Sequence, residues 1–200
     1  MRNALNTPWK IWNNLVRFLS TPAAYLLFWF NGIPFGKDWK LFGLPIIQKH
    51  SLSDIRIGKN LALRSSIRSN PLGPNHPVII CTWAPGAVLE IGDNFAMTGG
   101  IICAAEKVVI GNRVAVGANT TIVDTDFHPL DPEQRRMHPQ EAKTAPIIIE
   151  DDVFIGMSCL ILKGVTIGSG SVIGAGSVVT TDVPPRVVAA GNPAKVIRQL

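Results

Sequence analysis

Aliphatic residues recur at every sixth position through the C-terminal third of the chain. Six successive β-branched residues follow this spacing, namely Ile149, Ile155, Ile161, Ile167, Ile173 and Val179. Small or compact residues stand four positions after the first five of them, at Val153, Cys159, Val165, Ser171 and Ser177. A period of six fits neither an α-helix, with about 3.6 residues per turn, nor a free strand, whose side chains alternate. It is typical of a triangular coil in which each side is a short strand and each corner a tight turn.

Three such units close one coil, and successive coils pair as parallel strands. The same step occurs earlier in the chain, at Ile110, Val116 and Ile122, with weaker signs at Ile57, Leu63 and Ile91. The interval from Ile122 to Ile149 is not a multiple of six, so the polar segment of about 124–146 is expected to loop out of the prism. Segment 64–85, rich in Pro and Ser, reads as another insertion, either shaping an acceptor pocket or forming a plain surface loop.

The first fifty residues follow a different pattern. Five apolar residues fall on one helical face, namely Trp9, Trp12, Leu15, Val16 and Leu19. Thr21-Pro22 is a start signal for a second, more apolar helix through Phe30, which Asn31-Gly32 can end. We therefore divide the chain into an N-terminal helical cap segment, residues 1–50, and an all-β prism, residues 51–200. The helical segment either packs on the first coil or a neighbouring subunit, or lies on the inner membrane face as an interfacial helix.

Composition narrows the class of protein. The formal net charge is +5 without a dense basic block, so nucleic acid is not indicated as a partner. No apolar run approaches the roughly 20 residues that span a bilayer, and no signal peptide is recognised at the N-terminus. The cysteines, Cys81, Cys103 and Cys159, are scattered and odd in number, which favours a reducing compartment without disulfides.

Four segments together resemble the hexapeptide-repeat O-acetyltransferases, particularly bacterial sugar and polysaccharide acetyltransferases such as the maltose and galactoside enzymes. They are Asp-Thr-Asp-Phe-His-Pro-Leu-Asp-Pro at 124–132, the repeats at 167–179, Asp-Val-Pro-Pro at 182–185 and Ala-Gly-Asn-Pro-Ala-Lys-Val-Ile at 190–197. The likeness covers about residues 55–200. It implies a left-handed parallel β-helix, a homotrimer with active sites between subunits, and acetyl-CoA as co-substrate. We expect a cytoplasmic location, peripheral to the inner membrane if the N-terminal segment contacts lipid.

The resemblance assigns the general base to His128. A neutral imidazole near pH 7 can take a hydroxyl proton as the alcohol attacks a thioester and later return it to the thiolate. One of the loop acids, Asp124, Asp126 or Asp131, or a backbone carbonyl, would hold the imidazole in the correct tautomer. Of these we favour Asp126.

The resemblance also supplies candidates for the coenzyme A site. Four residues are expected to line the pantetheine arm, namely Met157, Ala175, Thr180 and Thr181. Lys195 and Arg198 are expected to face the phosphates, and Lys163 is added for its proximity in the repeat. No metal is expected, because the other histidines, His50, His76 and His138, have no setting defined by the repeat.

On the acceptor side the chain departs from the family pattern. Galactoside-type relatives carry an asparagine and an aspartate where this chain has Met97–Gly100 and Cys103–Glu106. Thr98, or a backbone N–H of Gly99 or Gly100, is therefore the expected oxyanion donor, with Asp124 as a further acceptor-side candidate. The departure argues against a simple galactoside or maltose as acceptor.

These observations predict an acetyl-CoA-dependent O-acetyltransferase acting on a sugar of a cell-surface polysaccharide, glycolipid or precursor. N-acetylation of an amino sugar is the alternative reaction, which the same base could serve. A β-helical binding or scaffold protein without catalysis is the alternative from another class. An acyl-cysteine mechanism is disfavoured, because Cys159 occupies an inward position of the repeat.

Overall fold

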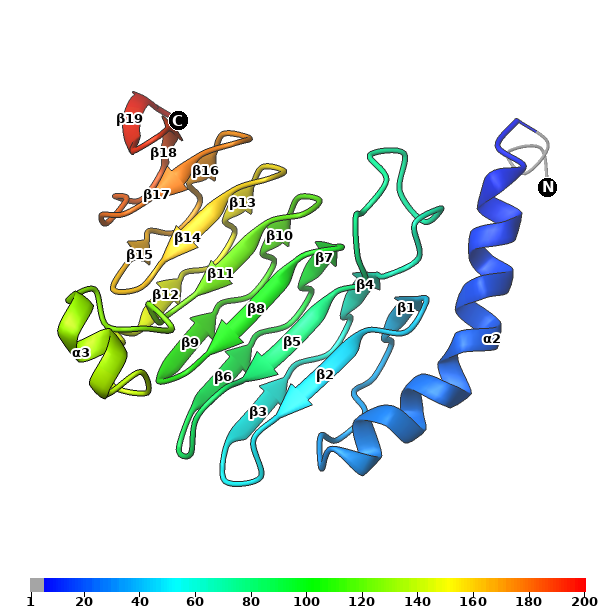
Figure 1. The fold of residues 1–200 in the computed structure, drawn as a ribbon. Coiled ribbons are helices and arrows are strands. Elements are labelled where there is room, and N and C mark those ends of the chain that lie inside the picture. Colours follow the sequence, from blue (N-terminus) through cyan, green and yellow to red (C-terminus); the bar gives the residue numbers. More distant parts are fainter. Residues whose placement is uncertain (1–5) are drawn as a thin grey trace.

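The six-residue repeat winds the chain into a three-sided prism, a left-handed parallel β-helix (Figure 1). The computed structural model describes residues 6–200. Each full coil contributes one strand to each of three sheets, and the strands of successive coils are parallel. Val116, for example, is in register with Met97 of the preceding coil and with Ile155 of the following coil.

The strands of each side are separated in sequence by about one coil. Side 1 consists of β1 (Lys40–Phe42), β4 (Ala62–Arg64), β7 (Ala96–Thr98), β10 (Ala115–Val116), β13 (Phe154–Ile155), β16 (Val172–Ile173), β18 (Val187–Gly191) and the antiparallel β19 (Ala194–Gln199). Side 2 consists of β2 (Ile46–Lys49), β5 (Ile79–Thr82), β8 (Ile101–Ala104), β11 (Thr121–Val123), β14 (Leu160–Leu162) and β17 (Val178–Val179). Side 3 consists of β3 (Asp54–Ile57), β6 (Val88–Ile91), β9 (Lys107–Ile110), β12 (Ile147–Ile149) and β15 (Thr166–Ile167).

The interior of the prism is the core that the repeat predicts. All six aliphatic positions of the main run have at most 1% of their surface exposed, namely Ile149, Ile155, Ile161, Ile167, Ile173 and Val179. The small partners, from Val153 to Ser177, are buried beside them. Burial of apolar side chains in this continuous interior is the main stabilising contribution, at about 25 cal/mol per Å² removed from water.

Two long insertions leave the prism at different edges. The segment between β11 and β12, residues 124–146, loops out as predicted and contains the short helix α3 (Pro132–Met137), whose N-cap is Asp131. The predicted insertion at 64–85 is shorter than expected. Its actual loop is 65–78, because residues Ile79–Thr82 form β5. The apolar run Ile79-Ile80-Cys81, which lies within the predicted insertion, forms part of this strand.

The N-terminal segment differs from the expectation in two respects. One helix, α2 (Trp9–Phe30), replaces the two predicted helices, and Pro22 lies inside it. The hydroxyls of Ser20 and Thr21 donate to the carbonyls of Val16 and Arg17, at 2.7 Å each, so polar bonds continue through the turn before the proline. The prism already begins at β1, whose first residue, Lys40, lies eleven residues before the predicted boundary at residue 51.

Helix α2 covers the first coil with its C-terminal half only (Figure 1). Phe28 is fully buried, and its ring lies 5.0 Å from that of Trp39 and 6.0 Å from that of Phe35. The predicted apolar face is largely exposed, with Trp9, Trp12 and Leu19 among its solvent-facing side chains. Within residues 6–200, no helix has both the length and the apolar character needed to cross a bilayer.

The last coil ends in the hairpin of β18 and β19. Because β19 pairs antiparallel with β18, the hairpin stands at the end of side 1, where an open strand edge would otherwise face solvent.

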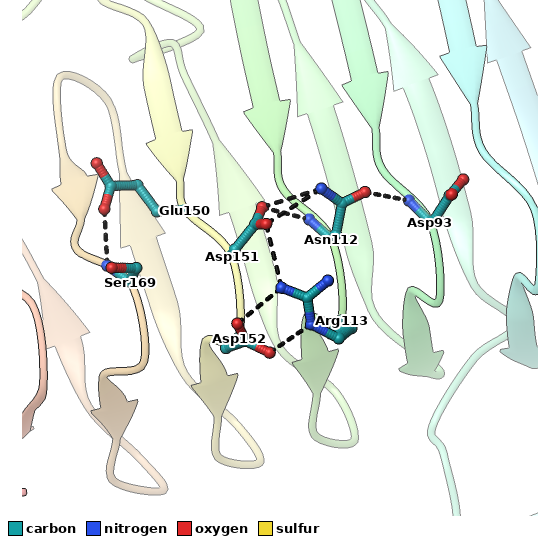
Figure 2. A network of polar contacts seen from close by, with 7 residues as sticks. All are labelled: Asp93, Asn112, Arg113, Glu150, Asp151, Asp152 and Ser169. Atoms are coloured by element: carbon teal, nitrogen blue, oxygen red, sulfur yellow. Dashed lines mark hydrogen bonds and ion pairs between the residues drawn. The ribbon is translucent and has the colours of Figure 1, made fainter.

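The edge between sides 3 and 1, the third edge, carries a ladder of polar side chains (Figure 2). The N–H of Asp93 donates to Asn112 Oδ1 at 2.9 Å, and the N–H of Asn112 donates to Asp151 Oδ1 at 2.8 Å. Arg113 donates to both carboxylate oxygens of Asp152, at 2.6 and 2.8 Å. Each bond joins one coil to the next, so the ladder fixes the stacking of the turns.

Acid should remove the contribution of this ladder. The N–H and side chain of Asn112 lower the pKa of Asp151, and the Arg113 guanidinium lowers that of Asp152. A depressed carboxyl pKa adds stability that is complete above the unfolded value and is lost as pH falls through the folded value. The gap in thermal midpoint between wild type and Arg113→Gln should therefore be constant from neutrality to about pH 5 and shrink below about pH 4. A gap unchanged at about pH 2 would contradict the assignment.

Candidate active site

The candidate site residues lie at two edges of the prism, on either side of side 2. The first edge, between sides 1 and 2, carries Thr98 at the end of β7 with Gly99 and Gly100 after it, Met157 after β13 and Ala175 after β16. The second edge, between sides 2 and 3, carries Asp124, Asp126 and His128 after β11, Lys163 after β14, and Thr180 and Thr181 after β17. The 4-residue strand β8 crosses the side between them, a distance of about 13 Å at 3.3 Å per residue. A single chain therefore does not bring the two groups together.

His128 lies on the loop that leaves the second edge. Its side chain is exposed, and its Nδ1 faces the carbonyl oxygen of Pro139 at 3.4 Å. Two features shape the loop around it. The backbone of Phe127 has a φ of +60°, and the Arg135 side chain donates to the Pro129 carbonyl at 3.3 Å. With Nδ1 directed at a carbonyl, Nε2 is the nitrogen available to accept a proton.

Asp126 is engaged elsewhere, contrary to the expectation that it orients the imidazole. Its Oδ1 accepts a hydrogen bond from Lys163 Nζ at 2.6 Å, and both side chains are mostly buried. The register explains this pairing, because Val123 lies beside Leu162 and the residues that follow are neighbours across the edge. The backbone carbonyl of Pro139, and not a carboxylate, therefore faces His128 among the described residues. The other oxygen, Asp126 Oδ2, is buried without a hydrogen-bond partner among residues 6–200.

Asp124 is a structural residue in this geometry and does not face an acceptor. It is 0% exposed, and its Oδ1 accepts the N–H of Ala105 at 2.6 Å. Its Oδ2 accepts the N–H groups of Glu106 and Lys107 at 2.8 and 2.7 Å. Burial raises the pKa of the Asp124 carboxyl, and the three N–H donors act in the opposite direction. The role is that of a clamp on the neighbouring turn, which corrects the acceptor-side assignment.

The other acceptor-side candidates form a tight corner on the first edge. The Thr98 hydroxyl accepts a hydrogen bond from Asn70 Nδ2 at 3.3 Å. The N–H of Gly99 donates to the carbonyl of Arg64 at 2.9 Å, so it is not free to serve as an oxyanion donor. A Cβ at Gly99, whose φ is +43°, would meet Pro74 of the 65–78 loop. Thr98 and Gly100 stay as candidates for the donor.

The predicted coenzyme A residues divide between three places. Met157 and Ala175 occupy successive turns of the first edge, and a Cβ at Gly156 would lie 2.5 Å from the Ala175 nitrogen, which shows how closely these turns stack. Thr180 and Thr181 are exposed on the second edge. Lys195 and Arg198 are exposed on β19, at the C-terminal end of the prism.

Two contacts of the loop were missed from the sequence. Trp83, in the turn between β5 and β6, packs edge-on against Phe127 with the ring centroids 5.9 Å apart. Thr144 donates to Glu106 Oε2 at 2.6 Å. Both pairs join residues about forty positions apart, and only the stacking of second-edge turns could have indicated them. They hold the two ends of the loop against neighbouring coils.

All three cysteines are buried, and Cys159 takes the inward position that the repeat predicts. Cys159 is buried, and its thiol donates to the Gly174 carbonyl at 3.1 Å. Burial raises the pKa of the Cys159 thiol, which disfavours the reactive thiolate. Cys81 and Cys103 are buried cross-strand neighbours on β5 and β8. No group of three or more His, Cys, Asp or Glu side chains in residues 6–200 is arranged to hold a metal ion.

Comparison with known proteins identifies relatives of this prism. A family model described as the hexapeptide repeat of succinyl-transferase matches residues 146–181. The galactoside O-acetyltransferase of Escherichia coli is 43% identical over 116 residues, which are 58% of this chain and 56% of that protein. The chain spans about half the length of the curated relatives that it matches.

Two solved structures are similar in fold and sequence. A galactoside acetyltransferase in complex with coenzyme A is 36% identical with a TM-score of 0.54, and the match covers 72% of this chain and 64% of that one. A hexapeptide-repeat acetyltransferase from Vibrio cholerae, complexed with acetyl coenzyme A, is 29% identical with a TM-score of 0.51, and the match covers 77% and 70% of the two chains.

Proposed function

Because the chain belongs to the hexapeptide-repeat acetyltransferase family, we propose that it transfers an acetyl group from acetyl-CoA to a hydroxyl group of a sugar, with His128 as the general base. The observation that carries the proposal is the position of His128. This histidine is exposed on a loop expelled from a rigid prism, and its Nδ1 faces a carbonyl, so Nε2 is left for proton transfer.

The reaction balances with one base. Nε2 takes the proton of the acceptor hydroxyl while the oxygen attacks the thioester carbonyl. The tetrahedral intermediate then breaks its carbon–sulfur bond, and the thiolate takes the proton from the imidazolium. The products are the acetyl ester and free coenzyme A. Thr98 or the N–H of Gly100 would stabilise the oxyanion.

Such a site requires two copies of the chain. His128 stands on the second edge, whereas Thr98, Met157 and Ala175 stand on the first edge. Packing of the second edge of one prism beside the first edge of its neighbour would bring them together. A heterologous contact of this kind closes into a ring, and with three-sided prisms we propose a homotrimer.

Acetyl-CoA would lie in the cleft between the two prisms. Its pantetheine arm would follow Met157 and Ala175 of one subunit and Thr180 and Thr181 of the next. Lys195 and Arg198 would meet the phosphates near the C-terminal end, because guanidinium and ammonium groups bind phosphate through charge-assisted hydrogen bonds. Asp126 and Lys163 would act as positioning residues that anchor the start of the catalytic loop.

The proposed acceptor is a sugar of a cell-surface polysaccharide, glycolipid or precursor. An amino sugar acetylated on nitrogen is the alternative, because the same imidazole could accept a proton from the attacking amine. Thiol release from acetyl-CoA with a panel of neutral, amino and phosphorylated sugars tests the proposal. A hydroxyl acceptor should give the fastest release. Binding of acetyl-CoA with no release on any acceptor would instead support a non-catalytic β-helix protein.

We also propose that the protein works in the cytoplasm and that α2 contacts an anionic membrane surface. Residues 6–37 carry Lys10, Arg17 and Lys37 and no acidic residue. Phe18 and Phe30 expose 76% and 75% of their surfaces, and exposed tryptophans accompany them. Aromatic residues beside cations are the composition of helices that lie in the headgroup region.

Vesicle binding tests this contact. Replacement of Phe18 with glutamate should lower co-sedimentation with anionic vesicles about tenfold, because one Phe side chain no longer enters the apolar layer and a like charge is added. Ile197→Glu, at an exposed apolar residue on β19, is the matched control and should bind as wild type does. Equal binding of wild type to anionic and neutral vesicles, or its absence from both, would rule out an anionic-surface contact.

A further inference from the structure

A cavity of about 710 Å³ lies between the N-terminal half of α2 and the first coils of the prism. Trp9 and Lys10 line it from the helix, and Phe42 and Arg64 line it from side 1. The rest of the wall comes from the 65–78 loop, including Arg68 and Asn70. The N-terminal helix and the first-edge insertion, neither of which follows the repeat, therefore enclose the cavity against two strands of side 1.

The charged side chains that line this cavity are all positive. Lys10, Arg64 and Arg68 line it, and no carboxylate is among its lining residues. None of these three cations makes an ion pair within residues 6–200, whereas Arg113 and Lys163 each meet an aspartate. The cavity thus offers three positive charges to an anion, together with the amides of Asn13, Asn14 and Asn70.

Arg64 is held in place before any ligand arrives. Its guanidinium lies over the Phe42 ring at 4.3 Å, and its Nη1 donates to the Ser69 carbonyl at 2.7 Å. A guanidinium has five N–H donors in a rigid fork, so most of them are left for a ligand. A pre-positioned fork of this kind matches phosphate oxygens better than a mobile lysine does.

The same residues connect the cavity to the candidate acceptor corner. Arg64 is in register with Thr98, and its carbonyl accepts the N–H of Gly99. Asn70 Nδ2 donates to the Thr98 hydroxyl. A ligand in the cavity would therefore extend directly toward the first-edge corner at which we place the reacting sugar.

We propose that this cavity binds a phosphoryl group carried by the sugar acceptor, so that the substrate class is a saccharide phosphate or diphosphate ester and not a neutral sugar. The identification of the ligand as the acetyl acceptor rests on the proposed acetyl transfer. The binding of an anion in this cavity does not depend on it. The exposed aromatic face of α2 borders the cavity at Trp9, which suits an ester whose other end is a lipid.

Calorimetric binding of inorganic pyrophosphate tests the anion site alone, with coenzyme A at saturation to occupy its own phosphate contacts. Arg68→Gln and Lys10→Gln should each weaken pyrophosphate about tenfold or more, because each removes one charge-assisted contact. Lys59→Gln, which removes an exposed cation on the third edge, is the control and should bind as wild type does. Absence of binding, or equal binding by all four proteins, would overturn the proposal.

Turnover then separates the cavity from the reaction. A free saccharide, its 1-phosphate and its lipid-linked diphosphate in vesicles are compared. Phosphoryl esters should show a lower KM than the free saccharide. Arg68→Gln should raise the KM for the esters with kcat unchanged, whereas Arg68→Lys, which keeps the positive charge, should raise it less. Whichever ester has the lower KM, the soluble 1-phosphate or the lipid-linked diphosphate, identifies the form in which the acceptor is bound. Equal KM values for free and phosphorylated saccharide would overturn the proposal and leave acetyl transfer standing. Pyrophosphate binding without turnover on any saccharide would leave the anion site standing and overturn the proposed acetyl transfer.

Discussion

Replacement of His128 with alanine is expected to lower the rate of acetyl transfer by about 10²–10⁴-fold, the usual contribution of a general base. Coenzyme A binding should be unchanged, because none of the proposed pantetheine or phosphate contacts involves this loop residue. The measurement is thiol release at saturating acetyl-CoA, together with calorimetric binding of coenzyme A.

His138 provides the matched control for this experiment. It lies on the same loop, is exposed, and faces Glu141 at 3.6 Å across a solvent-exposed pair. His138→Ala therefore removes an equal side chain from the loop without touching the Nδ1 contact of His128 with Pro139. Activity of His138→Ala near wild type, beside the loss in His128→Ala, would assign proton transfer to His128. Equal activities of the two variants would show that His128 is not the base.

The interior of this protein could be predicted from sequence because one spacing determines it. Each residue from Ile149 to Val179 at a step of six enters the same apolar interior, and the structure buries all of them. The expelled loop at 124–146 follows from the same count, since Ile122 and Ile149 fall out of phase. A fold built on a local repeat carries its register in the sequence itself.

The contacts of the loop could not be predicted in the same way. Asp126 was expected near His128 because the two are close in sequence, but coil stacking brings Lys163 to it across thirty-seven positions. Asp124 was grouped with the acceptor site for its place in a motif, and the structure shows that it clamps a turn. In both cases a neighbour along the prism, and not along the chain, determined the partner.

The distribution of the candidate site residues over two edges is harder to predict from the six-residue spacing than the interior is. Met157 and Thr180 are both near the end of a repeat, but one follows a strand of side 1 and the other a strand of side 2. Sequence spacing identifies a turn without saying which corner of the triangle it occupies, until every strand is assigned. Only then does it emerge that one chain holds half of each proposed site.

Asp124→Ala is expected to destabilise the protein by about 2–4 kcal/mol, because it leaves three backbone N–H groups of one tight turn without an acceptor. Ala105, Glu106 and Lys107 donate those N–H groups to a carboxylate that is fully buried. Asp124→Asn should cost less, about 1–3 kcal/mol. The amide oxygen can replace one carboxylate oxygen, but the amide nitrogen then faces another donor.

Urea unfolding at a fixed protein concentration measures both changes, since an oligomer makes the midpoint depend on concentration. Asp131→Ala is the control within the same loop. Asp131 caps α3 through the N–H groups of Glu133 and Gln134, and all of these residues are exposed, so its loss should cost about 1 kcal/mol at most in global stability. If Asp124→Ala unfolded at the same urea concentration as Asp131→Ala, the buried carboxylate would not be a structural clamp.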